Sequence, residues 1–282
     1  MSPVAAGTVT EALTAARDAL AAAGVDTPRL DAEVLLAEAL GVDRAALRTG
    51  SEDGVEPAAA RIFGAMVRRR VRREPVAYIT GRKGFRRIEL AVDRRVLIPR
   101  PETELLVEVA LELEPASVVD VGTGSGSVAL AIADEMTGVS LVGVDTSAPA
   151  IDVARANAER LGLGGEGGVE FEVLAPSTRS AGTRRQDLVV ANLPYVRDAD
   201  WATLAPEIRD YEPKEALLGG PDGLGPIRAL LGASPDCAAI ALEVGEGQAR
   251  EVEGLVAAAG FEKTERRRDL AGIERVILGL RK

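Results

Sequence analysis

The segment from residue 118 to residue 126 is Val118-Val119-Asp120-Val121-Gly122-Thr123-Gly124-Ser125-Gly126. A short apolar run enters a turn with glycine at every second position, and an apolar helical stretch follows from Val128 onward. Glycine has no Cβ, so the backbone of such a turn can pass close to a ligand. The turn by itself fits a dinucleotide, a nucleoside or no ligand at all.

A second segment narrows the choice of ligand. Val142-Gly143-Val144-Asp145 places an acidic residue at the end of the next predicted strand, 19 residues after Gly126. A carboxylate there can accept hydrogen bonds from both ribose hydroxyls of an adenosine-containing cofactor. The glycines do not show the G-x-G-x-x-G spacing typical of a pyrophosphate site. A sulfonium nucleoside without phosphates, S-adenosylmethionine, therefore fits better.

The predicted cofactor-binding residues are those of the turn, the acid of the next strand and one asparagine further along. They are Asp120, Gly122, Thr123, Gly124, Ser125, Gly126, Asp145 and Asn192. Two roles stay open for Asp120, which could neutralise the sulfonium or hold the glycine turn. Asp145 could cap the following helix as well as bind the ribose.

A predicted reaction site follows another apolar strand, Asp187–Ala191, which continues into Asn192-Leu193-Pro194-Tyr195. Ligands of parallel α/β sheets bind at the carboxyl ends of the strands. The side-chain carbonyl of Asn192 and the main-chain carbonyl of Leu193 could each accept an N–H of a planar amino group. Pro194 would stiffen the turn and Tyr195 could stack on the flat substrate, so all four are predicted to bind the substrate and take part in catalysis.

This arrangement suits methylation of an amide nitrogen, whose lone pair is delocalised into the carbonyl. Two acceptors that hold its hydrogens favour a pyramidal nitrogen with the lone pair directed at the methyl group. Catalysis then depends mainly on proximity and oriented dipoles. The chain has no histidine, which excludes Ser-His-Asp, Cys-His and imidazole-metal chemistry, and we expect no metal.

Three regions are expected along the chain. Residues 1–74 have helical patterns typical of a small bundle, with Thr10 and Thr27-Pro28 predicted to begin helices. Residues 75–101 predict a β-hairpin linker, because Ile88, Leu90 and Val92 alternate with other residues and Val96–Ile98 follows a polar Asp93-Arg94-Arg95 turn. Residues 102–282 alternate between strand-like and helical segments.

That alternation predicts a mainly parallel sheet with helices on both faces, a Rossmann-like α/β fold. The predicted strands are Ser117–Val121, Ser140–Val144, Val169–Val173, Asp187–Ala191, Ala238–Val244 and Gly272–Leu280. Helical stretches between them include Leu105–Leu113, Val128–Met136 and Ala148–Leu161.

Charge and composition indicate which partners and which cellular compartment to expect. The net charge is −10, which argues against a nucleic-acid partner. The segment Arg61–Arg100 is the exception: it has 13 Lys and Arg against three acidic residues, and it predicts either a solvated face or a docking surface for an acidic protein. We expect a cytoplasmic protein, because the sequence shows no secretory signal, no apolar run long enough to span a membrane and a single cysteine, Cys237.

Several blocks resemble the HemK/PrmC family of release-factor glutamine methyltransferases, over nearly the whole chain. The blocks are Glu74-Pro75-Val76-Ala77-Tyr78-Ile79-Thr80-Gly81, Leu97-Ile98-Pro99-Arg100-Pro101-Glu102-Thr103-Glu104, Asp120 to Gly126 with Asp145, Tyr211-Glu212-Pro213 through Ala216-Leu217 with Gly219-Gly220, Asp222-Gly223-Leu224 and Ile227-Arg228, Glu243-Val244-Gly245 with Gln248, and Asp269-Leu270-Ala271-Gly272 with Arg275. The second and fourth blocks are the specific ones.

The resemblance implies a helical N-terminal domain that docks the substrate, a hairpin linker and a seven-stranded methyltransferase domain. It implies transfer of a methyl group from S-adenosylmethionine to a glutamine side-chain amide of peptide chain release factors, in their Gly-Gly-Gln motif. Two departures stand out. Leu193 occupies the first proline position of the family's Asn-Pro-Pro-Tyr, and Ala175-Pro176-Ser177 has no acid where the family tends to have one near the adenine.

Two other hypotheses remain at this point. A related methyltransferase could act on a glutamine of a ribosomal protein or on a nucleic-acid amino group with the same Asn-x-Pro-Tyr chemistry. A protein that binds S-adenosylmethionine without turnover could keep the same fold.

Overall fold

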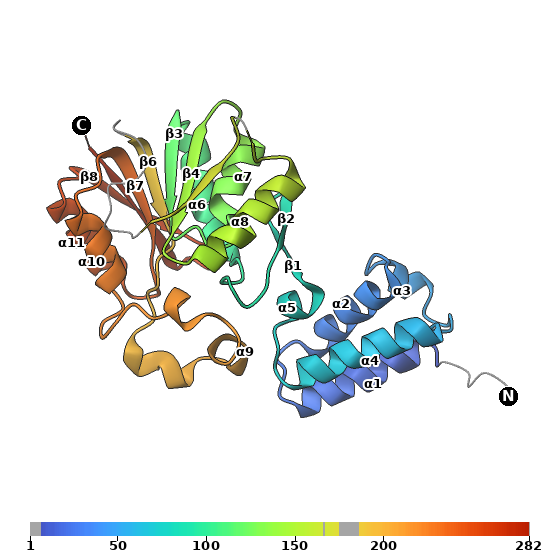
Figure 1. The fold of residues 1–282 in the computed structure, drawn as a ribbon. Helices are drawn as coiled ribbons and strands as arrows, with labels where there is room; N and C mark the ends of the chain where they lie inside the picture. Colours follow the sequence, from blue (N-terminus) through green and yellow to red (C-terminus); the bar gives the residue numbers. More distant parts are fainter. Residues whose placement is uncertain (1–6, 166, 175–185, 282) are drawn as a thin grey trace. The chain divides into compact units, whose positions relative to one another are not determined.

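The computed structural model describes residues 7–165, 167–174 and 186–281. The chain forms two compact units (Figure 1). The first contains the chain up to Gly81 together with Ala205–Tyr211, and the second contains Arg82–Leu204 and the chain from Glu212 onward. The chain therefore passes from one unit to the other three times.

The first unit is helical, and its apolar side chains form a core between α1, α2 and α4. Its helices are α1 (Val9–Ala22), α2 (Pro28–Leu40), α3 (Ala46–Thr49), α4 (Pro57–Val71), α5 (Val76–Thr80) and α9 (Pro206–Arg209). Gly41 ends α2 in the left-handed conformation that glycine adopts at low cost.

The start of α1 differs from the sequence prediction. Its cap is Thr8, whose side chain accepts from the Glu11 N–H while Glu11 accepts from the Thr8 N–H, a reciprocal capping box. The hydroxyl of Thr10 instead donates to Ser51 O at 2.8 Å. The prediction that Thr10 caps this helix is wrong. Thr8 takes that place because Glu11 follows it by the three residues that a capping box requires.

A buried ion network joins α2, α4 and α9 within the first unit. Arg70 donates to Asp31 at 2.6 Å and to Glu207 at 2.9 Å. Arg73 also pairs with Glu207, at 2.7 Å. Arg70 and Asp31 are each less than one-tenth exposed, so this network fixes the 205–211 segment on the bundle rather than presenting free charge.

The second unit contains a seven-stranded sheet in the order β5-β4-β3-β6-β7-β9-β8. Neighbouring strands from β5 to β7 are parallel, while β9 is antiparallel to both of its neighbours. The strands are β3 (Ser117–Val121), β4 (Ser140–Asp145), β5 (Glu170–Val173), β6 (Gln186–Ala191), β7 (Cys237–Glu243), β8 (Lys263–Arg268) and β9 (Glu274–Leu280).

Helices cover both faces of this sheet (Figure 1). One face has α6 (Glu104–Leu113), α7 (Ser127–Glu135) and α8 (Ala148–Leu161), and the other has α10 (Gly225–Gly232) and α11 (Ala249–Ala258). The short 3₁₀ helices are η1 (Pro101–Thr103), η2 (Asp198–Thr203) and η3 (Lys214–Ala216). The Rossmann-like α/β fold expected from the sequence is confirmed.

The strand β8 was missed by the sequence reasoning. Five of its six residues are charged, so it has no apolar periodicity. It pairs only with β9 in the sheet order, and its arginines make ion pairs to neighbouring elements, such as Arg266 with Glu253 and Arg267 with Glu112. Charged side chains are common on edge strands because they oppose pairing with another chain.

The β-hairpin was predicted with the wrong partner strands. It consists of β1 (Arg82–Phe85) and β2 (Ile88–Ala91), in antiparallel register with Arg86 and Arg87 in the turn. Val96–Ile98 is not a strand. Phe85 pairs with Ile88 and both side chains are buried. Their burial favours the two-residue turn at Arg86 and Arg87 over the predicted turn at Asp93-Arg94-Arg95.

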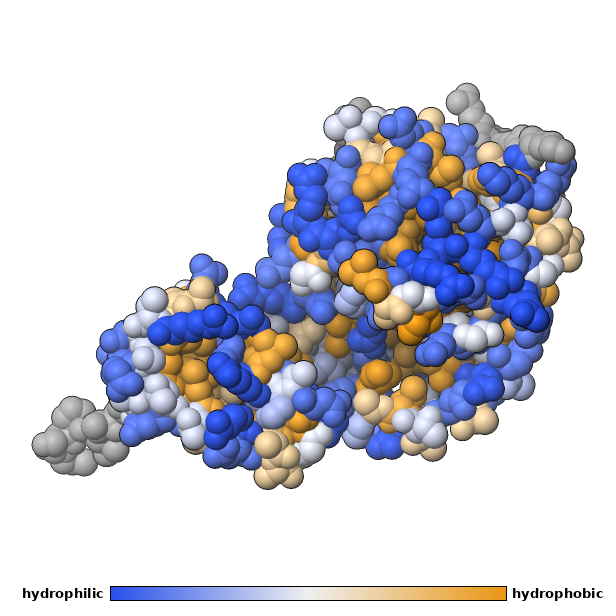
Figure 2. All heavy atoms as spheres, turned by 180° about the vertical axis from the view of Figure 1, so that it is seen from behind, coloured by the Kyte–Doolittle hydropathy of each residue, from blue (hydrophilic) through white to orange (hydrophobic). Residues whose placement is uncertain are grey.

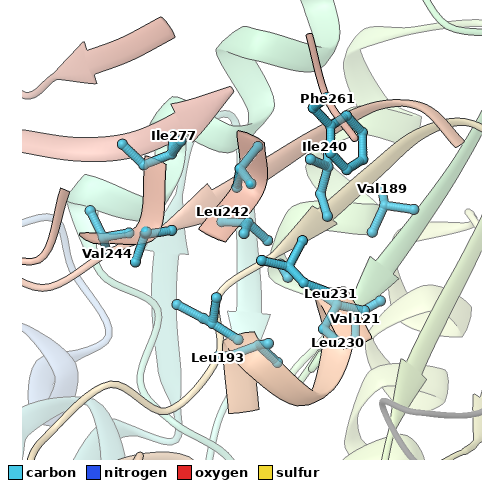
Figure 3. Close-up of a cluster of buried hydrophobic side chains, with 14 of the residues drawn as sticks. Val121, Val189, Leu193, Leu230, Leu231, Ile240, Leu242, Val244, Phe261 and Ile277 are labelled. Carbon is cyan, nitrogen blue, oxygen red and sulfur yellow. The ribbon is translucent and has the colours of Figure 1, made fainter. Parts of the chain in front are cut away.

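The face of the sheet toward α10 and α11 holds a continuous apolar core. Figure 3 shows part of it, with Leu193, Leu230, Leu231 and Val121 among the labelled side chains. Leu193 is only 3% exposed. A residue of the predicted reaction site therefore also belongs to the core.

Figure 2 shows one face of the molecule. Hydrophilic residues are spread over both units there, and small groups of apolar residues are scattered among these hydrophilic residues. Within the described part of the chain, no helix has both the length and the apolar character needed to cross a bilayer.

We expect Asp31→Ala to lower the free energy of unfolding by about 3 kcal/mol, since it leaves the buried Arg70 with one carboxylate fewer. Urea titration followed by helical circular dichroism would measure this. Arg29→Ala is the matched control, because the Arg29–Glu33 pair is on the same helix with Arg29 79% exposed and should change stability by at most about 0.5 kcal/mol. Equal effects of the two changes would contradict a structural role for the network.

Candidate active site

The glycine turn after β3 requires glycine for two reasons. Gly122, Gly124 and Gly126 have φ angles of 76°, 57° and 82°, a region that residues with a Cβ rarely adopt. A Cβ on Gly122 would also lie 3.2 Å from the Leu193 side chain and 3.4 Å from Asn192 O. The turn and the Asn192 loop thus pack main chain against main chain.

The buried Asp120 side chain fixes this turn by hydrogen bonds. Its Oδ2 accepts from the Thr123 hydroxyl at 2.7 Å and from the Ala129 N–H at 3.3 Å. The side chain is 2% exposed, and burial raises the pKa of Asp120 to about 6. Of the two roles considered for Asp120, these contacts support holding the glycine turn.

Asp145 ends β4 beside the turn. Its Oδ2 accepts from the Gly124 N–H at 3.0 Å, and its Oδ1 accepts from the Ser147 N–H at 2.9 Å. Ser147 itself caps α8, accepting from the Ala150 N–H. Each carboxylate oxygen has a further lone pair, so Asp145 can accept from two hydroxyl groups while its orientation stays fixed.

A cavity of about 490 Å³ opens at this carboxyl edge. Gly122, Gly124, Asp145, Asn192, Leu193 and Pro194 line it together with apolar side chains that include Leu97, Ala150 and Leu174. A smaller recess of about 40 Å³ adjoins Asp120, Thr123, Ser125, Thr103 and Asn192. Gly122, Gly124 and Asn192 line both hollows, so the structure brings most of the predicted residues together.

Tyr195 is not among the described residues that line these two hollows. Its ring approaches Gly245, and its carbonyl accepts from Gln248 Nε2 at 3.0 Å. Burial, with the charge of Glu243, raises the pKa of Tyr195 to about 12. These contacts support the loop, and stacking of Tyr195 on a substrate stays a prediction.

Asn192 has a defined side-chain partner. Its Nδ2 donates to the Thr103 hydroxyl at 3.0 Å. The amide oxygen Oδ1 is then the group with which Asn192 can accept a hydrogen bond at the cavity wall. This is the orientation that holding an amino group requires.

Comparison with known proteins gives the family. The PrmC N-terminal domain matches residues 11–81 and a methyltransferase domain matches residues 118–211. A release factor glutamine methyltransferase of Caulobacter vibrioides is 39% identical, covering 97% of this chain and 96% of its own. One from Geobacter sulfurreducens is 40% identical, with 96% of each chain covered.

The chain belongs to the release factor glutamine methyltransferase family. Among solved structures, the hMettl16 catalytic domain in complex with MAT2A 3′UTR hairpin 1 is 12% identical, with a TM-score of 0.56 and coverage of 68% of this chain and 74% of that chain. At that identity the likeness shows the fold alone. This member of the family is a methyltransferase that uses S-adenosylmethionine.

The site residues fit that cofactor. The positive-φ glycines leave a surface without Cβ atoms, Asp145 offers two oriented acceptors for ribose hydroxyls, and Ala150 and Leu174 form an apolar wall for an adenine. The positions where the family tends to have an adenine-side acid, Ala175–Ser177, lie outside the described residues.

The sequence reasoning missed several residues that fix the site in this methyltransferase. Glu212 is buried and accepts from the Ile98 N–H at 3.1 Å and from Arg100. Asn157 is fully buried and donates from Nδ2 to Ser125 O and Ala91 O, at 3.0 Å each. The signal for Asn157 was present, since an asparagine lies on the apolar face of a helix.

The glycines of the downstream blocks now have a physical role. A Cβ on Gly219 would lie 2.6 Å from Pro194 O, and one on Gly223 would lie 2.3 Å from Tyr195 O. Glycine at these positions lets the downstream loop pack directly on the Asn192–Tyr195 turn. This explains why a specific block lies so far along the sequence from the turn that it supports.

We expect Asp145→Ala to weaken S-adenosylmethionine binding at least tenfold, because hydrogen bonds to a charged acceptor contribute roughly 1.5–3 kcal/mol each. Isothermal titration calorimetry measures the affinity. Asp152→Ala is the control, since Asp152 is an exposed acid of the neighbouring helix α8. An unchanged affinity in Asp145→Ala would remove Asp145 from the cofactor site.

Proposed function

We propose that this protein transfers a methyl group from S-adenosylmethionine to the side-chain amide nitrogen of a glutamine in peptide chain release factors. The relatives that align with this chain over almost their full length are named release factor glutamine methyltransferase. The observation that carries the chemistry is the oriented Asn192 amide, whose Nδ2 is engaged by Thr103 at 3.0 Å.

The cofactor supplies an electrophilic methyl group on a sulfonium. Asn192 Oδ1 and the carbonyl of Leu193 would hold the two hydrogens of the substrate amide, which directs its nitrogen lone pair toward the cavity that Gly122, Gly124 and Asp145 line. A carbon–nitrogen bond forms as a carbon–sulfur bond breaks, and the methylated nitrogen then loses its proton to water. These fixed dipoles lower the barrier because they need no rearrangement during the reaction.

Leu193 replaces the family's proline but keeps the main-chain carbonyl that would accept a hydrogen bond from the substrate amide. Any residue at this position supplies a main-chain carbonyl. Its leucine side chain packs in the core beside Gly122 and is 3% exposed, so packing holds the turn that proline would otherwise stiffen. The departure is therefore compatible with catalysis.

A protein substrate is favoured over a nucleic acid. The net charge is −10, which opposes approach of a polyanion. A release factor works in translation, so we place the reaction in the cytoplasm. The alternatives of a ribosomal-protein glutamine and of a binding protein without turnover are not favoured by the names of the relatives.

We assign substrate docking to the helical unit up to Gly81. Within the basic segment, Arg69 pairs with Glu74 at 2.8 Å, and Arg70 and Arg73 pair with Glu207, so these three arginines are already engaged inside the unit. Arg61, Arg68 and Arg72 are exposed on α4 and at its C-cap. Their spacing of seven and four residues places them on one face of the helix.

Asn192→Ala should lower single-turnover methyl transfer to a release factor by about a hundredfold, comparable to loss of one preorganised polar group. Affinity for S-adenosylmethionine should change much less, because Gly122, Gly124 and Asp145 remain. The rate is measured with labelled cofactor under saturation of both sites. A rate within a few-fold of the parent would contradict the proposed mechanism.

Arg61→Glu combined with Arg68→Glu should raise KM for a whole release factor more than KM for a short glutamine peptide, because the peptide reaches only the reaction site. Steady-state kinetics on both substrates measures the difference. Arg17→Glu is the control, an arginine of α1 that is already paired with the adjacent Asp18. Equal changes on both substrates would argue against docking by α4.

A further inference from the structure

Leu270 is the most exposed large apolar side chain in the part of the chain that the structure describes. Its exposed fraction is 110%, whereas that of the next, Ile62, is 49%. Single apolar residues are common on protein surfaces, but most of them are partly covered by their neighbours. A leucine that projects fully from the surface contributes nothing to the core, so its use depends on how it is held and on what lies around it.

The turn that carries Leu270 is fixed by hydrogen bonds. Asp269 Oδ1 accepts from the N–H groups of Ala271 and Ile273, at 2.9 Å each. The Gly272 N–H donates to Asp269 O, and the Asp269 N–H donates to Ile273 O, both at 2.9 Å. Gly272 has a φ angle of 80°, a left-handed value that glycine adopts at low cost. Leu270 is thus held at the tip of a turn whose main chain has little freedom.

This turn lies at the edge of the sheet that carries the reaction site. It joins β8 to β9, and Val276 of β9 pairs with Glu243, the last residue of β7. Because β9 is antiparallel to β7, it begins where β7 ends. Strand β6 is parallel to β7 and ends at the same edge, with Asn192 directly after its last residue. Leu270 and Asn192 therefore belong to loops of one edge of the sheet.

Hydrogen bonds join the Leu270 turn to the reaction loop. Arg275 donates from Nε to Asp269 Oδ2 at 3.0 Å, and its carbonyl accepts from the Val244 N–H at 2.8 Å. Val244 begins the loop after β7, in which Gln248 donates from Nε2 to Tyr195 O at 3.0 Å. The position of the turn is therefore fixed relative to the loop that would hold the substrate amide.

We propose that Leu270 is a docking contact for the release factor, buried against an apolar patch of that protein beside the loop that carries the glutamine. The inference rests on the proposed function and adds a surface of the methyltransferase unit to it. A folded protein that reaches a cavity with one side chain also comes against the loops around that cavity. A fixed turn loses little conformational entropy on binding, so burial of its leucine contributes efficiently to affinity.

The other occupant that could cover Leu270 is a second copy of this chain. Two copies with a net charge of −10 each repel one another. A stable interface also buries about 1,200–2,000 Å², of which one leucine supplies only a small part. A substrate protein is held at the cavity as well, so it needs only a small additional contact. The release factor is therefore the favoured occupant.

The test is steady-state methyl transfer to a whole release factor. Leu270→Ser should raise KM about tenfold, a fold-change within the range that burial of a leucine side chain represents, and should leave kcat within about twofold. Leu270→Met should stay close to the parent, because methionine offers a similar apolar area. Leu113→Ser is the matched control, an exposed leucine of the same unit that ends α6 ahead of the amino end of β3, and it should not change KM.

Two further measurements complete the test. KM for a short glutamine peptide should be unchanged in Leu270→Ser, because the peptide does not reach the Leu270 turn. Size-exclusion chromatography should give the same apparent mass for the parent and for Leu270→Ser. A parental KM for the release factor in Leu270→Ser, an equal rise of KM for the peptide, or a parental dimer that Leu270→Ser dissociates would overturn the inference.

The parent protein separates failure of this inference from failure of the proposed function. If the parent transfers no methyl group to a release factor, the proposed function fails. If the parent methylates the release factor and Leu270→Ser does so with a parental KM, the proposed function stands and only docking by Leu270 is removed.

Discussion

The close approach of two main-chain segments at the carboxyl edge of β3 is the constraint on which the site depends. Gly122 lies against the Asn192 carbonyl and the Leu193 side chain, where a Cβ would be tightly packed, and its φ of 76° favours glycine. The contact brings the cofactor turn and the reaction turn into one cavity wall. Parallel pairing of β3 with β6 sets this approach, since Val121 and Ala191 are register partners at the ends of both strands.

Buried and half-buried polar side chains support this arrangement. Glu212 binds the Ile98 N–H, Asn157 binds Ser125 O and Gln248 binds Tyr195 O. Each joins segments far apart in the sequence, and a buried polar group that lost its partner would cost about 1–3 kcal/mol. The loops at the cavity are therefore held as firmly as the strands, which suits catalysis by fixed dipoles.

The chain passes between the two units more than once. The chain leaves the sheet after Leu204, places Glu207 in the ion network with Arg70 and Arg73, and returns at Glu212, which holds the Arg100 loop. The loop that follows the reaction turn is thus anchored in the helical unit before it supports the cavity. One continuous stretch of backbone therefore runs from the site through the unit proposed to dock the substrate and back.

The sequence by itself determined the glycine turn, the acid of β4 and the Asn192 turn, because each rests on local chemistry: positive φ, a strand-end carboxylate and a strand-end amide. It also determined the α/β alternation and the family. It could not determine the edge strand β8, whose charged residues show no apolar period, or the true hairpin pairing. Only the tertiary structure placed Thr103 against Asn192. That contact joins residues 89 positions apart, and no local pattern encodes a hydrogen bond between side chains that meet only after the sheet has formed.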